Sequence, residues 1–361
     1  MGSLEMFSTS KVEEKIIQNT PSFPITAIID NRNKTNSNEK SLELILKIII
    51  KDIPIIEDKY LNILILDDKR LLIGYTLYLI ILSKKTFQKE LIIDLRDIIT
   101  EYNNSTSIIY LTQLKNGNLA VVINKSNVYF IKLSQNSYEL MGKLVSRNPK
   151  KIIEKNNNLY FLESQQISVW HCKFNIFSYS KLELIPLNDI FKIFRCGNFI
   201  FTNDHEIALT NFQEIMFYNI ESKNKIQIRC KECSFSPDFC PNNMILLNNN
   251  ILLMGCIDYK WGFGSVFLID IIKKEIICHE VLQLFSIIKL KNGEFLCGVM
   301  EINNNKNFGH KIMRLKILGE KLIIANSQIC HDKQINDILE LDNEIILSGS
   351  RDGCVKVWKT L

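Results

Sequence analysis

Short polar turns flanked by apolar runs recur along the chain. Each turn contains Asn or Asp, often with Gly, residues that tolerate the positive φ of tight β-hairpins. Each flank is rich in Ile, Leu, Val and Phe, and the seven segments are ILDDKRLLIG, QLKNGNLAVV, IEKNNNLYFL, FTNDHEIALT, LLNNNILLMG, KLKNGEFLCG and ELDNEIILSG. The pattern predicts seven hairpins whose strands are buried on both faces.

The turns follow one another at a nearly regular interval. Successive markers are 41 to 50 residues apart, counted at Asp68, Asn116, Asn157, Asp204, Asn249, Asn292 and Asp342. A third apolar run follows each hairpin, as in NVYFIKL, and a more polar fourth run usually comes next, as in QKELIIDL. Four strands in such an interval suit one blade of a propeller. The sequence therefore predicts an all-β fold, a seven-bladed β-propeller of four-stranded antiparallel blades.

The last copy has only three strands before Leu361, which would leave an open sheet edge. The apolar segment 41–51, SLELILKIIIK, precedes the first full copy and has no hairpin partner. We expect this N-terminal strand to complete the last blade and close the ring. The predicted domains are a partly flexible tail over residues 1–40 and a propeller over residues 41–361.

Residues 330–359, CHDKQINDILELDNEIILSGSRDGCVKVWK, resemble a WD40 repeat. They are similar to that family's pattern of Gly-His, a strand, a Ser-Gly-Ser-x-Asp turn and a strand ending in Trp, although Cys330 replaces the usual Gly and Lys359 the usual Asp. The resemblance implies a hydrogen-bonded tetrad that holds the blade together, formed by His331, Ser348, Asp352 and Trp358. A buried indole and imidazole do need such partners. The other six copies keep the apolar skeleton alone.

Composition and charge narrow the function classes. The chain is 46% hydrophobic and 23% charged, as in a folded globular protein, and its formal net charge of +5 is small for 361 residues. This balance disfavours nucleic acid as a partner. The scattered cysteines and an N-terminus without a secretory pattern predict a cytoplasmic or nuclear protein with reduced thiols. The apolar run 71–82 is too short to span a membrane and is expected to be a buried strand.

One cysteine-rich segment raises the question of a metal. Cys230 and Cys233 have CxxC spacing, and Cys240 follows seven residues after the second. Structural zinc needs four ligands, usually from two such pairs, and His310 is the candidate for a distant fourth ligand. We favour free thiols, with no metal and no cofactor, and the zinc alternative stays open.

We find no catalytic pattern in the sequence. The five histidines form no HExxH motif or Ser-His-Asp order, and neither a P-loop nor a nucleophile elbow is present. The segment GFGSVF at Gly262 lacks the third Gly and the helix of a dinucleotide site. We therefore expect a protein that is not an enzyme. The alternative is a set of scattered carboxylates that converge in a central channel.

Three long links between predicted strands would lie on one face of a propeller. Residues 257–265 and 300–310 lengthen links in blades five and six, and residues 230–242 enter blade five. Aromatic residues in exposed loops are typical of binding surfaces. The partner-binding candidates are Phe235, Phe239, Tyr259, Trp261, Phe263, Phe308 and His310. In the alternative interpretation, these aromatics fold back onto the blades.

The function predicted from these features is a scaffold, monomeric on its own, that presents loops to protein or peptide partners. An alternative is a propeller that binds nucleic acid or anionic lipid. Such a protein would use lysine-rich links as a basic rim, for example Lys84-Lys85 and Lys273-Lys274.

Overall fold

The computed structural model of the protein describes most of the chain beyond residue 59, and three short segments before it. The described residues are 4–5, 25–28, 42–50, 60–99, 102–103, 106–123, 127–145, 149–163, 166–172, 179–186, 197–210, 214–229, 239–248, 250–258, 263–302, 308–319, 321–342 and 344–360. They form seven sheets with four or five strands each, which confirms the prediction of seven blades. The one helix in these ranges is a 3-10 turn, η1 (Leu95–Asp97), and no described helix is long or apolar enough to cross a membrane.

The chain divides into two compact units, which are described separately. The first unit comprises residues 1–26 and 49–187 and holds three blades. Their strands are β4 (Leu61–Ile65), β5 (Arg70–Tyr75), β6 (Tyr78–Ser83) and β7 (Lys89–Asp94) in blade one; β8 (Ile108–Gln113), β9 (Leu119–Ile123), β10 (Asn127–Leu133) and β11 (Tyr138–Val145) in blade two; and β12 (Lys151–Lys155), β13 (Asn158–Leu162), β14 (Gln166–Cys172) and β15 (Tyr179–Pro186) in blade three. A short strand, β1 (Leu4–Glu5), pairs with β11 as a fifth strand of blade two.

The second unit comprises residues 27–48 and 188–361 and holds four blades. The first two have the strands β16 (Asn198–Phe201), β17 (Glu206–Thr210), β18 (Glu214–Asn219) and β19 (Lys225–Arg229) in blade four, and β20 (Phe239–Asn248), β21 (Ile251–Asp258), β22 (Phe263–Asp270) and β23 (Glu275–Glu280) in blade five. The others have β24 (Gln283–Lys289), β25 (Phe295–Ile302), β26 (Phe308–Leu318) and β27 (Lys321–His331) in blade six, and β28 (Ile335–Asp342), β29 (Ile345–Ser350) and β30 (Cys354–Thr360) in blade seven.

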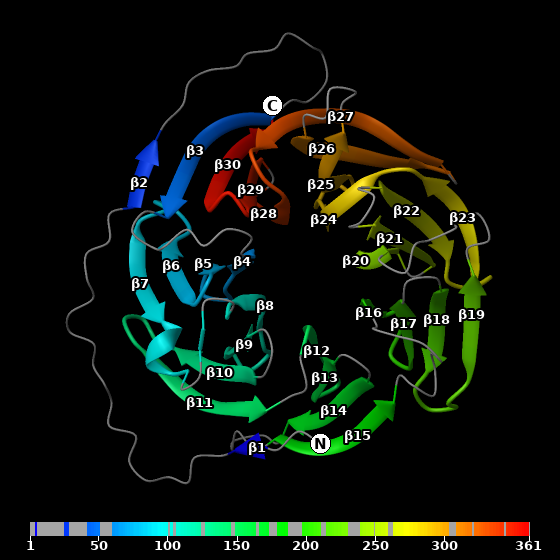
Figure 1. Cartoon of the computed structure of the whole chain (residues 1–361), viewed down its shortest axis with the longest axis horizontal. Helices are drawn as coiled ribbons and strands as arrows, with labels where there is room; N and C mark the ends of the chain where they lie inside the picture. The colour runs from blue at the N-terminus through cyan, green and yellow to red at the C-terminus, as the bar shows by residue number, and fades with distance from the viewer. Residues whose placement is uncertain are drawn as a thin grey trace. The chain divides into compact units, whose positions relative to one another are not determined.

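The fourth strand of blade seven comes from the N-terminal part of the chain. Strand β3 (Leu42–Ile50) is hydrogen-bonded beside β30, which confirms the expected completion of the last blade (Figure 1). Its side chains Leu42 and Ile48 are buried, as an inserted strand requires. A further strand, β2 (Ile25–Ile28), pairs on the outer side of β3. The region predicted as a tail therefore supplies two edge strands, β1 and β2.

The apolar run 71–82 is two strands rather than the single buried strand expected. β5 and β6 are joined by the turn residues Thr76 and Leu77, and Thr76 has a φ of +52°. Nearly every side chain of this hairpin is fully buried, because it is covered on both faces. Strands of that kind lack alternation of polar and apolar residues, so periodicity could not reveal the turn.

Glycines on the second strands allow neighbouring blades to approach closely. A Cβ atom built on Gly74 would lie 2.4 Å from Cδ1 of Leu111 in the next blade. The same relation joins blade five to six and six to seven, at 2.6 Å from Gly255 to Leu284 Cδ2 and 2.9 Å from Gly298 to Ile335 Cβ. Side chains do not pack at such distances, so these positions need glycine for close packing.

The hairpin turns provide a second joint between blades. In three places a turn N–H donates to a side-chain oxygen on the first strand of the next blade. The pairs are Asp67 N to Gln113 Oε1 at 2.8 Å, Lys115 N to Glu154 Oε2 at 2.7 Å, and Lys291 N to Glu340 Oε2 at 2.8 Å. These contacts join blades one to three in the first unit and blades five to seven in the second.

Candidate functional site

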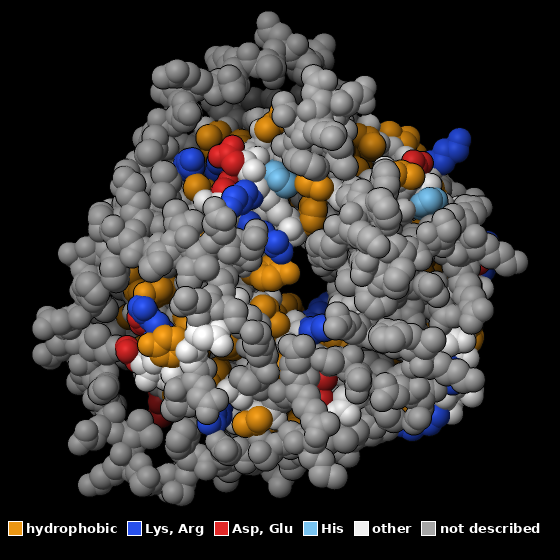
Figure 2. Space-filling view, in the orientation of Figure 1, with side chains coloured by type: hydrophobic (Ala, Val, Ile, Leu, Met, Phe, Trp, Pro, Cys, Tyr) orange, Lys and Arg blue, Asp and Glu red, His pale blue; other side chains and the backbone are white. Residues whose placement is uncertain are grey.

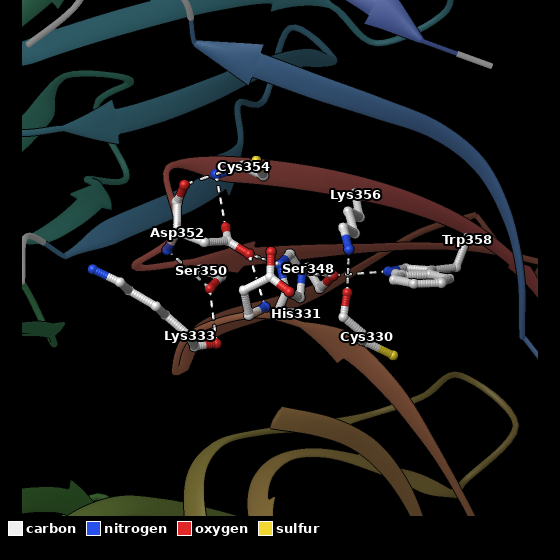
Figure 3. Close-up of polar contacts among 10 residues, drawn as sticks. Cys330, His331, Lys333, Ser348, Ser350, Asp352, Cys354, Lys356 and Trp358 are labelled. Atoms are coloured by element: carbon white, nitrogen blue, oxygen red, sulfur yellow. Dashed lines mark hydrogen bonds and ion pairs between the residues drawn. The ribbon is translucent and has the colours of Figure 1, made fainter. Parts of the chain in front are cut away.

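A chain of hydrogen bonds links His331, at the end of β27 in blade six, to three side chains of blade seven (Figure 3). Nε1 of Trp358 donates to Oγ of Ser348 at 2.7 Å, and that oxygen lies 2.8 Å from Nε2 of His331. Nδ1 of His331 lies 2.8 Å from Oδ2 of Asp352. The structure thus brings together all four residues of the predicted tetrad, on β27, β29, the turn before β30, and β30 itself.

The direction of the hydrogen bonds follows from the donors available. An indole N–H can only donate, so Ser348 Oγ accepts from Trp358 and its own hydrogen is left for His331 Nε2. Burial lowers the pKa of His331, although the hydrogen bond to Asp352 acts to raise it. The imidazole is therefore neutral at pH 7 and donates from Nδ1 to the Asp352 carboxylate.

Asp352 is held by the backbone as well as by the histidine. Its carboxylate accepts from the backbone N–H of Cys354 at 2.9 Å and of Asp332 at 3.3 Å. Burial acts to raise the pKa of Asp352, but the hydrogen bonds and the charge interaction with His331 outweigh it and lower the pKa to about 2. A carboxylate with these partners stays ionised and closes the β29–β30 turn.

Lys356 extends the network, and the sequence pattern did not identify it. Its Nζ donates to the backbone carbonyl of Cys330 and lies 5.9 Å from the ring centroid of Trp358. Burial raises the pKa of the Cys330 thiol to about 12, so this cysteine packs as a small apolar group. The polar groups of this cluster are satisfied by one another and by the backbone, and they join β27 of blade six to blade seven, so we assign the cluster to stability.

Solved structures are similar to this chain, whereas no protein-family model and no curated protein matches it. A chain in the crystal structure of the Mitotic Checkpoint Complex is similar with a TM-score of 0.64 at 10% identity, over 92% of this chain and 98% of that one. The WD40 β-propeller domain of Doa1 is similar with a TM-score of 0.57 at 10% identity, over 84% of this chain and 94% of that one. The chain has the fold of a seven-bladed β-propeller.

A third similar structure comes from a different kind of protein. The extracellular domain of the putative hybrid two-component system BT4673 from B. thetaiotaomicron has a TM-score of 0.60 at 13% identity, over 82% of this chain and 37% of that one. Identities this low show the fold of the propeller and leave its partners open.

The aromatic candidates do not occupy long loops where the structure describes them. Phe239, Phe263 and Phe308 belong to the strands β20, β22 and β26, so the loop prediction is wrong for these three. The register places Asp258 of β21 between Phe239 and Phe263. The described parts of these two segments continue the hairpins: pairing extends to Asp258 and Phe263 in blade five and to Ile302 and Phe308 in blade six. Phe235, Tyr259 and Trp261 lie outside the described residues.

His310 also differs from the expectation of an exposed loop residue. It lies in β26 opposite His331 of β27, is buried, and its ring centroid is 6.5 Å from that of Phe285. Burial lowers its pKa, and its Nδ1 has no hydrogen-bond partner. Cys240 is in β20, and Cys230 and Cys233 lie outside the described residues. Among described side chains, no group of three His, Cys, Asp or Glu could hold a metal, so the zinc question stays a prediction.

The lysine-rich link between β22 and β23 forms ion pairs within the propeller. Nζ of Lys274 lies 2.5 Å from Oε1 of Glu206 in blade four and 3.8 Å from the ring centroid of Phe217, and the side chain is 14% exposed. Nζ of Lys273 lies 3.5 Å from Oε1 of Glu275. On the face shown in Figure 2, described Lys and Arg side chains (blue) form separate spots. The described residues therefore do not favour a basic rim.

Proposed function

We propose that the protein is a non-enzymatic scaffold of the cytoplasm or nucleus, monomeric by itself, whose loops hold protein or peptide partners. The observation that carries this proposal is the set of joints between successive blades. Close-packed glycines and turn hydrogen bonds join blades one, two and three in the first unit and blades five, six and seven in the second. Loops carried on such a support are held in place before binding, which reduces the entropy lost on association.

The comparisons support the same role. One similar chain is part of the Mitotic Checkpoint Complex, by its name an assembly of several components. A second is a WD40 propeller domain. The tetrad residues contact one another and the backbone of blades six and seven, so we assign them to stability and look for partner contacts elsewhere.

The extended hairpins of blades five and six are the surface we propose for partner contact. β21–β22 and β25–β26 have eight or more residues in every strand, longer than the hairpins of blade one. The aromatic candidates Phe263 and Phe308 begin β22 and β26, and Phe239 begins β20 opposite Asp258 at the end of β21. Tyr259 and Trp261 lie between β21 and β22 in the sequence. Aromatic side chains commonly dominate the binding energy of protein interfaces.

Affinity purification from the native organism tests this proposal. We expect the wild-type chain to retain a defined set of proteins and a Trp261→Ala, Phe263→Ala variant to lose at least one of them. The matched control is Tyr102→Ala, which removes an exposed aromatic side chain in the first unit. Identical partner sets for all three chains would contradict the assignment of this surface, and the absence of any specific partner would contradict the scaffold itself.

A further inference from the structure

Among the described residues, the outer edge of blade six has no added fifth strand, whereas the sheets of blades two and seven each have one. Strand β27 is the last strand of its sheet, with no strand outside it among the described residues (Figure 1). At 11 residues it is one of the two longest described strands. An unpaired edge presents backbone N–H and C=O groups that can pair with another strand.

The exposed side chains of β27 are mainly apolar. Ile324 is 56% exposed and Ile329 is 65% exposed. They lie opposite Leu315 and Lys311 of β26, two positions on one face of the sheet. Charged residues in the middle of an edge strand usually protect it from pairing with another chain. Strand β27 has no charged residue between Lys321 and His331. This face of β27 would contact apolar side chains of an added strand.

The opposite face of β27 leads into a crevice. It is lined by Leu42, Leu296, Ile312 and Arg314, together with the polar residues Asn326, Ser327 and Gln328 of β27. Arg314 is 6% exposed and pairs through Nη1 with Glu294. Its Nη2 is buried and has no hydrogen-bond partner. A buried guanidinium N–H without a partner is costly, and a carboxylate is the acceptor that suits it best.

The charge of the β26–β27 hairpin favours the same chemistry. Residues 308–331 carry Lys311, Arg314, Lys316 and Lys321 against one acidic residue, Glu320. Glu294 is the acidic group paired with Arg314, and it also lies 3.3 Å from Nζ of Lys316. The local charge therefore stays positive, which attracts an acidic segment.

The molecule itself shows what covers such an edge. Blades two and seven each carry an added fifth strand: β1, with the sequence LE, on β11 and β2, with the sequence ITAI, on β3. We propose that the outer edge of β27 binds an extended peptide of a partner protein in which apolar residues alternate with Asp or Glu. Because side chains of a strand alternate between faces, the apolar residues would contact Ile324 and Ile329 and an acidic residue would reach Arg314 in the crevice.

This inference rests on the proposed scaffold function, since it names the partner chemistry of one surface. Random ten-residue peptides displayed on phage are selected against the full chain, and the dissociation constants of enriched peptides are measured by fluorescence anisotropy. We expect enriched sequences to alternate apolar and acidic residues. Exchange of the acidic residue for its amide should weaken binding about tenfold, and the loss should shrink at high salt.

Two protein variants locate the site. Ile324→Asp with Ile329→Asp should weaken peptide binding at least about tenfold, because charges of the peptide's own sign replace apolar contacts. The matched control is Ile272→Asp, which changes an isoleucine that is 69% exposed in the β22–β23 turn and should leave binding unchanged. Arg314→Gln should abolish the preference of the protein for an acidic peptide over its amide variant. Exchanging the acidic residue of the peptide for its amide tests the same contact on the wild-type protein, without altering the fold.

The remaining outcomes separate this inference from the scaffold proposal. Enriched peptides that bind the β27 variant as well as the wild type would overturn the edge site while leaving a peptide-binding scaffold in place. Failure to enrich any alternating acidic peptide would overturn it as well. Retention on phosphatidylserine vesicles that is lost in the Ile324→Asp, Ile329→Asp variant, with no peptide enriched, would reassign the surface to a membrane.

Discussion

Blade seven and blade one use different chemistry at corresponding positions. When Gly349 and Gly74 of their second strands are aligned, Ser348 corresponds to Ile73, and Leu77 lies in the turn where blade seven has Asp352. The turn of blade seven is one residue longer, and strand pairing matches Trp358, opposite Ile346, to Leu82, opposite Leu71. All three apolar side chains are buried, as Ser348 and Trp358 are. One backbone arrangement therefore accepts either a directional hydrogen-bond chain or plain apolar packing.

The difference shows why the two blades should respond differently to change. Apolar packing has no preferred direction, so a smaller side chain costs contact area and leaves a cavity. A hydrogen-bond chain in a buried site makes each member depend on its neighbours, because the loss of one leaves others unpaired. The predictions below test that contrast, in order of decreasing effect.

Removal of residues 1–51 should have the largest effect. It deletes β3, exposes the edge of β30 and uncovers the side of blade seven, whereas blade one takes all four strands from one continuous segment. We expect aggregation and loss of a cooperative unfolding transition, measured by size-exclusion chromatography and circular dichroism. A monomeric truncated chain with the wild-type melting temperature would show that β3 is dispensable.

Trp358→Ala should lower the free energy of unfolding by about 3–5 kcal/mol, since it removes a buried aromatic side chain. Leu82→Ala, at the matching position of blade one, should cost about 2–5 kcal/mol. Chemical denaturation of both variants measures the values. An unchanged unfolding free energy for Trp358→Ala would contradict the role of the indole in blade seven.

Ser348→Ala should cost about 1–3 kcal/mol, because Nε1 of Trp358 and Nε2 of His331 both lose their partner. The reciprocal change, Ile73→Ser, places an unpaired hydroxyl in the apolar blade and should also destabilise it. The same denaturation assay applies to both. If Ile73→Ser left the unfolding free energy unchanged, hydrogen-bond partners would not decide which residue type each blade accepts.

Acid should affect blade seven selectively. Burial places the pKa of His331 in the folded protein below its unfolded value, so the unfolded chain takes up the proton first and stability falls as the pH drops below about 6.5. Asp352, whose pKa is about 2, adds a further loss below about pH 4. His331→Gln should flatten the stability profile between pH 7 and 5, measured by melting temperature. A wild-type slope in that variant would assign the acid sensitivity elsewhere, for example to His310.

The turn joints should give the smallest effect. Glu340→Ala removes the acceptor of the Lys291 N–H and should cost about 0.5–1.5 kcal/mol. Glu340→Gln should be nearly neutral, because Gln113 already accepts the corresponding N–H of Asp67 in the first unit. Thermal unfolding of the two variants distinguishes the loss of the hydrogen bond from the loss of charge. Equal destabilisation by both variants would show that the charge of Glu340, and not its hydrogen bond, stabilises the joint.

Much of the fold was predictable because tight turns constrain residue type strongly. Asn, Asp and Gly at regular intervals revealed seven hairpins, and the unpaired segment 41–51 revealed the strand that completes blade seven. Strand ends were less predictable. The hairpins of blades five and six continue through Gly264 and Gly309, residues that favour loops, since pairing with a neighbouring strand outweighs such local preferences.

The close contacts between blades also leave a signal in the hairpin segments. Four of the seven quoted segments end in Gly, at Gly74, Gly255, Gly298 and Gly349, the position that admits the next blade wherever its contacts are described. Lys356 and Arg314 could not be identified in this way. Their partners, a carbonyl of β27 and a carboxylate beside β25, are set by the fold and not by neighbouring residues in the sequence.

A double-mutant cycle between Ser348 and Trp358 tests the central claim most directly. The unfolding free energies of wild type, Ser348→Ala, Trp358→Phe and the double variant are measured under the same conditions. If a hydrogen-bond chain holds blade seven, the double variant costs less than the sum of the single variants, with a coupling of about 0.5–3 kcal/mol. Additive costs would contradict the account, because they would mean that the two side chains stabilise the blade independently, as apolar packing alone would.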